Sequence, residues 1–214
     1  MDEEISIIDT NTRNEKIKNF LISNKKILIV IILTIIFLFV GYFSFEEIKQ
    51  RGKIKLANQF NLVTMTYNSG QGEQTIKTLI NIIKKRDDTY SPLALYFLID
   101  NNLIENKKEI NALFEILINE VNLKKEIKNL IIYKKALYNS GFVDENELIQ
   151  ILNPIINSKS IWKSHALYLV AEYFYSNKEN QKAKEFFNQI IILPDANYDI
   201  KLESQKRINR DFSE

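Results

Sequence analysis

His165 is the only imidazole in this chain of 214 residues, and the chain contains no cysteine. Imidazoles and thiols are the side chains that most often act as bases, nucleophiles and zinc ligands near neutral pH. Because His165 is near Trp162 and the chain has no second histidine or thiol, we expect His165 to be a packing or surface residue. The absence of cysteine also excludes disulfide frameworks and iron–sulfur sites. We expect no catalytic residue and no metal site.

Two pairs of adjacent acids, Glu46-Glu47 and Asp87-Asp88, are the other candidates for acid–base chemistry. Neighbouring residues on a helix point apart, and both pairs fall at the ends of predicted elements, so capping or solvation is their expected role. Gly70-Gln71-Gly72 lacks the third glycine and the strand of a dinucleotide-binding loop, and no GxxxxGK[ST] motif occurs. The sequence therefore predicts neither an enzyme nor a bound cofactor.

The composition indicates a helical chain that does not bind nucleic acid. Only five glycines and three prolines occur, and 45% of the residues are hydrophobic. So few turn-forming residues disfavour all-β folds and flexible linkers. The formal net charge is +2, and the lysine clusters, of which Lys134-Lys135 is one, alternate with acids. Such mixing is typical of a solvated helical face and not of a phosphate track.

Residues 27–45 form an uninterrupted apolar run, ILIVIILTIIFLFVGYFSF, that contains no charge. As a helix these 19 residues are about 28 Å long, close to the hydrocarbon thickness of a bilayer. A buried core helix and a cleaved signal peptide are the alternatives. The polar leader of residues 1–26, the length of the run and the lack of a small-residue cleavage site before Glu46 favour an uncleaved anchor.

The charges that flank the run favour a cytoplasmic N-terminus. Five basic residues precede it and four follow it, so the count alone decides little. Lys25-Lys26 adjoin its first residue, whereas Glu46-Glu47 adjoin its last. The sequence therefore predicts a single-pass protein of a bacterial inner membrane, with residues 46–214 outside the cytoplasm.

Residues 46–214 have helical periodicity throughout and a repeat of about 36 residues. The equivalent positions Ile76, Ala112, Leu148 and Ala183 are separated by 36, 36 and 35 residues, and an apolar residue follows four positions after each. These positions predict the second helices of four helix pairs. The first helices are predicted at residues 49–67, 92–101, 123–138 and 161–175, and a last helix at 198–210 caps the stack. A plain helical domain without superhelical stacking is the alternative.

Capping residues and prolines set the expected helix boundaries. Ser91 and Ser160 are predicted as N-caps, and Asp144 forms a predicted capping pair with Glu147. Pro154 lies inside a predicted second helix, which it is expected to break or kink. Pro194 is predicted to close the last full pair.

The last pair carries a pattern that resembles the tetratricopeptide repeat. Its apolar and small residues have the spacing of that motif, with Leu at the first position where the motif favours Trp; they are Leu167, Val170, Ala171, Phe174, Ala183, Phe187, Ile190 and Pro194. Together with the apolar run of residues 27–45, this resemblance predicts an all-α fold in which one transmembrane helix precedes an α-solenoid of about four tetratricopeptide-like pairs with a capping helix. The eight residues are expected to be structural. Trp162 is either a core anchor between pairs or a contact for a partner.

Three stretches give the whole layout a likeness to a bacterial family. They are the leader N-E-K-I-K-N-F at 14–20 followed by Lys25-Lys26, the segment Gln50-Arg51-Gly52, and Trp162-Lys163-Ser164-His165-Ala166 with Glu172. These resemble the charged leader, the polar helix leaving the membrane and a late repeat of the YfgM-like ancillary Sec-translocon subunits. The resemblance implies a periplasmic domain and, as partners, Sec channel subunits, periplasmic chaperones or exported polypeptides.

These observations predict a binding and scaffold module that is held at the membrane and is not an enzyme. Its partners are proteins and membrane lipid. An accessory Sec-translocon subunit that links exported proteins to chaperones is the first hypothesis. The alternative is a scaffold for another envelope assembly, such as a cell-division, outer-membrane or respiratory complex.

Overall fold

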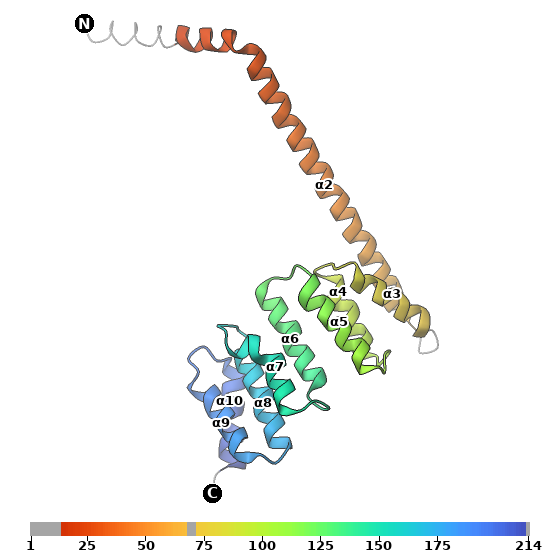
Figure 1. The fold of residues 1–214 in the computed structure, drawn as a ribbon, viewed down its shortest axis with the longest axis vertical. Coiled ribbons are helices and arrows are strands. Elements are labelled where there is room, and N and C mark those ends of the chain that lie inside the picture. Colours follow the sequence, from red (N-terminus) through yellow and green to blue (C-terminus); the bar gives the residue numbers. More distant parts are fainter. Residues whose placement is uncertain (1–13, 68–71, 213–214) are drawn as a thin grey trace, which may run out of the picture. The chain divides into compact units, whose positions relative to one another are not determined.

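The computed structural model describes residues 14–67 and 72–212, and within these ranges the chain is helical with connecting turns and no strand. The all-helical prediction is confirmed (Figure 1). The first thirteen residues of the predicted leader, and Gly70 and Gln71 of the predicted turn, lie outside the described residues. Chain contacts separate two units, Met1–Lys55 and Leu56–Glu214.

Unit 1 contains a helical stretch at residues 14–23 and most of α2, Lys25–Met65. α2 is one continuous helix of 41 residues that includes the apolar run, and none of its residues is buried. It is long and apolar enough to cross a membrane. The Thr34 hydroxyl donates to the Val30 carbonyl at 2.9 Å, which satisfies this polar group inside the apolar run.

Unit 2 contains the end of α2 and eight further helices in the part of the chain that is described. Their bounds are Gly72–Lys84 (α3), Tyr90–Asp100 (α4), Lys107–Glu120 (α5), Lys125–Asn139 (α6), Glu145–Ile156 (α7), Lys163–Ser176 (α8), Asn180–Ile192 (α9) and Tyr198–Asp211 (α10). Each predicted helix of the repeat analysis falls on one of these elements. The 36-residue period therefore located real helices.

The helix ends in the structure agree only in part with the predicted capping residues. Asp144 caps α7 by accepting from the Glu147 amide at 2.9 Å, as predicted. Ser91 is not an N-cap: α4 begins at Tyr90, the Asp87 carboxylate accepts from the first amides, and the buried Ser91 hydroxyl donates to the Ile82 carbonyl. Ser160 is not one either, because α8 is preceded by Trp162.

Pro154 does not break its helix, contrary to prediction. α7 continues to Ile156, and Pro154 lies exposed in its last turn. A proline removes one backbone donor and crowds the turn before it, so the cost is smallest where few helical residues follow. Pro194 lies in the turn after α9, as predicted.

Helices of unit 2 pack against their sequence neighbours, from α3 on α4 through to α9 on α10, and also in the alternate pairs α3 with α5, α6 with α8 and α8 with α10. The buried side chains form two clusters. The amino-terminal core includes Leu79, Leu95 and Phe114, and the carboxy-terminal core includes Leu148, Phe174 and Phe187. Two adjacent residues of α6 belong to different cores: Ile131 lies in the amino-terminal core and Ile132 in the carboxy-terminal core. α6 therefore joins the two.

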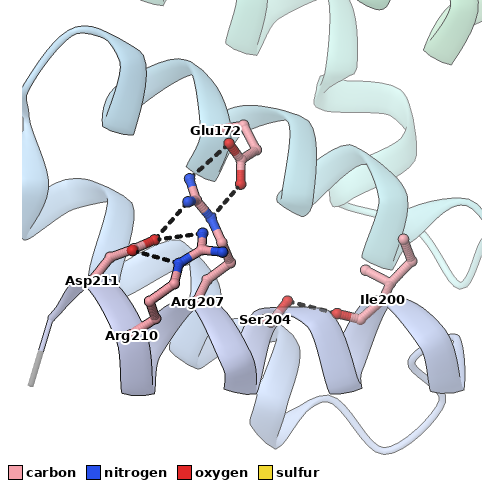
Figure 2. A network of polar contacts seen from close by, with 6 residues as sticks. All are labelled: Glu172, Ile200, Ser204, Arg207, Arg210 and Asp211. Atoms are coloured by element: carbon pink, nitrogen blue, oxygen red, sulfur yellow. Dashed lines mark hydrogen bonds and ion pairs between the residues drawn. The ribbon is translucent and has the colours of Figure 1, made fainter.

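α10 docks on the carboxy-terminal core partly through a buried arginine, whose polar contacts Figure 2 shows. Its buried residues are Ser204 and Arg207. The Arg207 guanidinium donates two hydrogen bonds of 2.8 Å to the Glu172 carboxylate of α8 and a third of 2.5 Å to Asp211. It also lies 4.1 Å from the centre of the Tyr175 ring. The hydrogen bond from Arg210, followed by the nearby charge of Arg207, keeps the pKa of Asp211 below its usual value.

Candidate protein-binding face

Seven of the eight repeat-signature residues lie in the carboxy-terminal core. Leu167, Val170, Ala171 and Phe174 of α8 and Ala183, Phe187 and Ile190 of α9 are each at most 2% exposed, while Pro194 is exposed. Side chains buried to this degree pack the domain and are not accessible to a partner.

Trp162 is half-buried and is held against α6. Its indole nitrogen donates to the Glu126 carbonyl at 3.0 Å, and its ring stacks on Tyr133 with centroids 6.0 Å apart. Beneath it, the Ser160 hydroxyl donates to the Glu126 carboxylate at 2.7 Å and accepts from Asn129 at 3.0 Å. This polar cluster joins α6 to the start of α8. A contact of Trp162 with a partner stays a prediction.

His165 packs on the same aromatic group. Its ring centroid lies 5.1 Å from that of Trp162 and 6.0 Å from that of Tyr133. Its Nδ1 is buried and has no hydrogen-bond partner among the described residues. Burial lowers the pKa of the imidazole below its ordinary value. His165 is thus a packing residue that is neutral at pH 7, in line with the expected role.

Protonation of His165 is therefore predicted to oppose folding. Because its pKa is lower in the folded chain, its contribution to stability is complete above the ordinary value of about 6.5 and is lost as the pH falls from there toward the folded pKa. An NMR titration is expected to show the single imidazole titrating with a midpoint below pH 6.5. His165→Gln is expected to flatten the dependence of the melting temperature on pH between 7 and 5.5. A titration midpoint at or above 6.5 would contradict this assignment.

The exposed sides of α4 and α6 carry a mixture of apolar and polar residues. Leu93 is 41% exposed on α4, and Ile127 and Leu137 are 44% and 51% exposed on α6. On α6, Ile127, Lys134 and Leu137 have helical spacing along one face, whereas Asn129, Ile132 and Ala136 are buried on the other. We call Leu93, Tyr96, Ile127, Lys134 and Leu137 the even-helix face.

Lys134 and Lys135 are adjacent but have different roles. The Lys134 ammonium lies 4.2 Å from the centre of the Tyr96 ring, which links α6 to α4 across the even-helix face. Lys135 is 17% exposed and pairs with Glu115 of α5 at 2.5 Å. That hydrogen bond lowers the pKa of Glu115, and burial raises the pKa of Tyr96 to about 12. Of the two lysines in this predicted solvated cluster, Lys135 thus forms an ion pair with α5 and Lys134 lies over the Tyr96 ring.

The acid pairs considered for chemistry do not converge. Glu47 pairs with Arg51 at 2.8 Å on the exposed surface of α2, and the Asp87 carboxylate accepts from backbone amides at the start of α4. Among the described residues, no group of three or more histidine, aspartate or glutamate side chains is placed to hold a metal ion.

The structure shows what the sequence did not single out. Arg207 was missed because an arginine in a polar helix normally lies on the surface, although its spacing from Asp211 was a signal for an ion pair. Tyr96 was missed because an isolated tyrosine carries no motif. Comparison with known proteins gives no further assignment: no protein-family model, curated protein or solved structure matches this chain.

Proposed function

We propose that this protein is a membrane-anchored module that binds other proteins through the even-helix face of a helical-repeat domain. The observation that carries the proposal is the exposure of Leu93, Ile127 and Leu137 on helices whose other faces are buried. Apolar residues that share one helix face and are rimmed by polar ones mark surfaces that receive extended peptides or partner helices. Lys134 adds a cation beside them.

A tetratricopeptide-like solenoid is the architecture that we infer for unit 2. Its support is the repeat of about 36 residues together with packing between sequence neighbours and alternate helices. In a solenoid each pair contacts mainly the pairs next to it, and the first helices of successive pairs line one surface. α4, α6 and α8 are the first helices of pairs two to four, and α10 takes the position of the capping helix.

Tethering gives such a weak binder its function. A module fixed in the bilayer meets membrane-bound partners at high effective concentration, so contacts with micromolar affinity are productive. We infer that the site of action is the Sec translocon, where the module links exported polypeptides to periplasmic chaperones. Resemblance of the leader, the span and Trp162-Lys163-Ser164-His165-Ala166 to YfgM-like subunits supports this inference.

Affinity purification from membranes in mild detergent tests the proposal. Full-length protein is expected to recover Sec channel subunits and periplasmic folding factors, whereas a control of residues 1–55 recovers neither. Ile127→Glu with Leu137→Glu is expected to lower recovery at least tenfold, and the matched exposed pair Gln150→Glu with Gln189→Glu to leave it unchanged. Recovery of division, outer-membrane or respiratory proteins without Sec would support the alternative scaffold and contradict the Sec assignment.

The proposed orientation has its own test, since the chain has no native cysteine to react. A single cysteine at Asn19, on the N-terminal side of the apolar run, is expected to be protected from a membrane-impermeant maleimide in intact spheroplasts. A cysteine at Gln150 in α7 is expected to be labelled. The reverse pattern would place unit 2 in the cytoplasm and would contradict its proposed role among periplasmic chaperones.

A further inference from the structure

The loops of unit 2 fall into two sets that lie at opposite ends of its helices. At one end, Arg86 before α4 pairs with Glu120 at the end of α5. There also, Glu126 at the start of α6 contacts Ser160 before α8, and the Asn197 amide before α10 donates to the Ser164 hydroxyl at 3.2 Å. These contacts place four linkers at the same end of the helices, namely α3–α4, α5–α6, α7–α8 and α9–α10.

The other linkers meet at the opposite end. Lys107 after the α4–α5 linker lies 3.6 Å from the centre of the Phe142 ring in the α6–α7 linker. The Tyr173 hydroxyl, near the end of α8, donates to the Val143 carbonyl at 3.0 Å. Helices α4, α6 and α8 therefore run in the same direction, with their first residues at the first end.

These two ends carry opposite charge. Residues 84–90, 120–125, 156–163 and 192–198 form the first end and include seven basic and four acidic residues. Residues 100–107, 139–145 and 176–180 of the opposite end include two basic and five acidic residues. We call the first the basic end. Within the described residues its six lysines form no ion pair; they are Lys84, Lys85, Lys124, Lys125, Lys159 and Lys163.

Large apolar side chains are also exposed at the basic end. Ile161 is 65% exposed between Lys159 and Lys163, and Ile192 and Tyr198 on either side of the α9–α10 turn are each 76% exposed. Isolated apolar and aromatic side chains beside lysines are the combination that binds the interface of an anionic bilayer. The lysines attract lipid phosphates, and the apolar groups enter the headgroup region.

The chain also enters unit 2 at this end. The Phe60 ring lies 6.0 Å from that of Tyr90, the first residue of α4, and the Tyr67 ring lies 5.5 Å from that of Phe97 near its end. The last turns of α2 therefore run away from the basic end. Leu56, which comes before these turns, lies nearer to the basic end than they do. Ten residues join Leu56 to the apolar run, so even a fully extended tether would reach only about 35 Å.

From this arrangement we propose that the basic end binds the anionic phospholipid headgroups of the membrane in which α2 is anchored. Binding of lipid at the basic end leaves the even-helix face free to bind proteins. The proposal rests on the anchoring of α2 but on no particular protein partner. Each lysine near an anionic surface strengthens binding roughly fivefold. The effect weakens as salt shortens the screening length from about 8 Å at physiological strength.

The single tryptophan supplies the probe, since Trp162 adjoins Ile161 at the basic end. Full-length protein is reconstituted in nanodiscs that contain nitroxide-headgroup lipid, with either phosphatidylcholine alone or 30% phosphatidylglycerol. Trp162 fluorescence is expected to be quenched more strongly in the anionic discs, and 0.5 M NaCl is expected to remove the difference. Co-elution of protein with discs checks the anchor separately, so a failure of anchoring is distinct from a failure of docking.

Matched lysine variants assign the effect to the basic end. Lys124→Gln, Lys125→Gln and Lys159→Gln together are expected to lower the ratio of docked to undocked protein on the order of a hundredfold. Lys107→Gln, Lys108→Gln and Lys178→Gln, toward the opposite end, remove the same charge and are expected to leave quenching unchanged. Equal quenching in neutral and anionic discs, or an equal loss with both triple variants, would overturn the proposal.

Discussion

Replacing Arg207 with alanine is expected to lower the free energy of unfolding of unit 2 by about 2–4 kcal/mol. Breaking a buried ion pair by removing one partner costs roughly 3–5 kcal/mol, because the remaining charge stays without compensation. The Arg207 side chain is 10% exposed, but its partner Glu172 is 35% exposed, so water recovers part of the loss. Urea titration in mild detergent, followed by circular dichroism, measures the change.

Arg210 provides the control for this prediction. It lies one turn away on α10 and also donates to Asp211, but its side chain is 64% exposed. Arg210→Ala is expected to change stability far less than Arg207→Ala, because water screens an exposed ion pair. A double-mutant cycle of Arg207→Ala with Glu172→Gln should give a coupling of at least about 1 kcal/mol. Equal effects of the two arginine substitutions would contradict the docking of α10 by Arg207.

Replacing Phe114 with alanine is expected to cost about 3–5 kcal/mol, the largest effect we predict. Phe114 is fully buried in the amino-terminal core, and its ring lies 6.1 Å from that of Tyr138 in α6. Truncation of a buried phenylalanine loses its transfer free energy and leaves a cavity. The same urea titration measures the loss as a shift of the midpoint to lower denaturant.

Phe142 is the matched control, because its ring lies 5.6 Å from the same Tyr138 but its side chain is 40% exposed. Phe142→Ala is expected to cost about 1 kcal/mol or less. Since α6 joins both cores, Phe114→Ala and Phe174→Ala should shift one common transition. Two separate transitions, each moved by one substitution, would show that the cores unfold independently.

Periodicity in the sequence predicted the helices of unit 2 but not which of their faces are exposed. The spacing of Ala112, Leu148 and Ala183 depends on core positions that recur with every pair, so it marks the elements reliably. On α6, in contrast, isoleucine occurs on both faces: Ile127 is 44% exposed while Ile131 is fully buried. Hydrophobicity alone could not separate them, because α6 has neighbours along several sides.

Local polar chemistry was the harder part to predict. Asp144 was recognisable as a cap because its bond to the Glu147 amide is local in sequence. The buried Ser91 hydroxyl instead bonds to the end of α3, and the Ser160 hydroxyl to α6 across 34 residues. Such contacts depend on tertiary packing, and no spacing rule reveals them. The same reason explains why the docking of α10 through Arg207 was not predicted.

Site-specific photocrosslinking in native membranes tests most directly whether this protein binds partners through the even-helix face. A photoreactive residue at Ile127 or Leu137 is expected to give discrete adducts, which mass spectrometry would identify. The same residue at Gln150 or Gln189, exposed on α7 and α9, is expected to give none. Absence of adducts at Ile127 and Leu137, or equal adducts at all four positions, would contradict the proposed binding face.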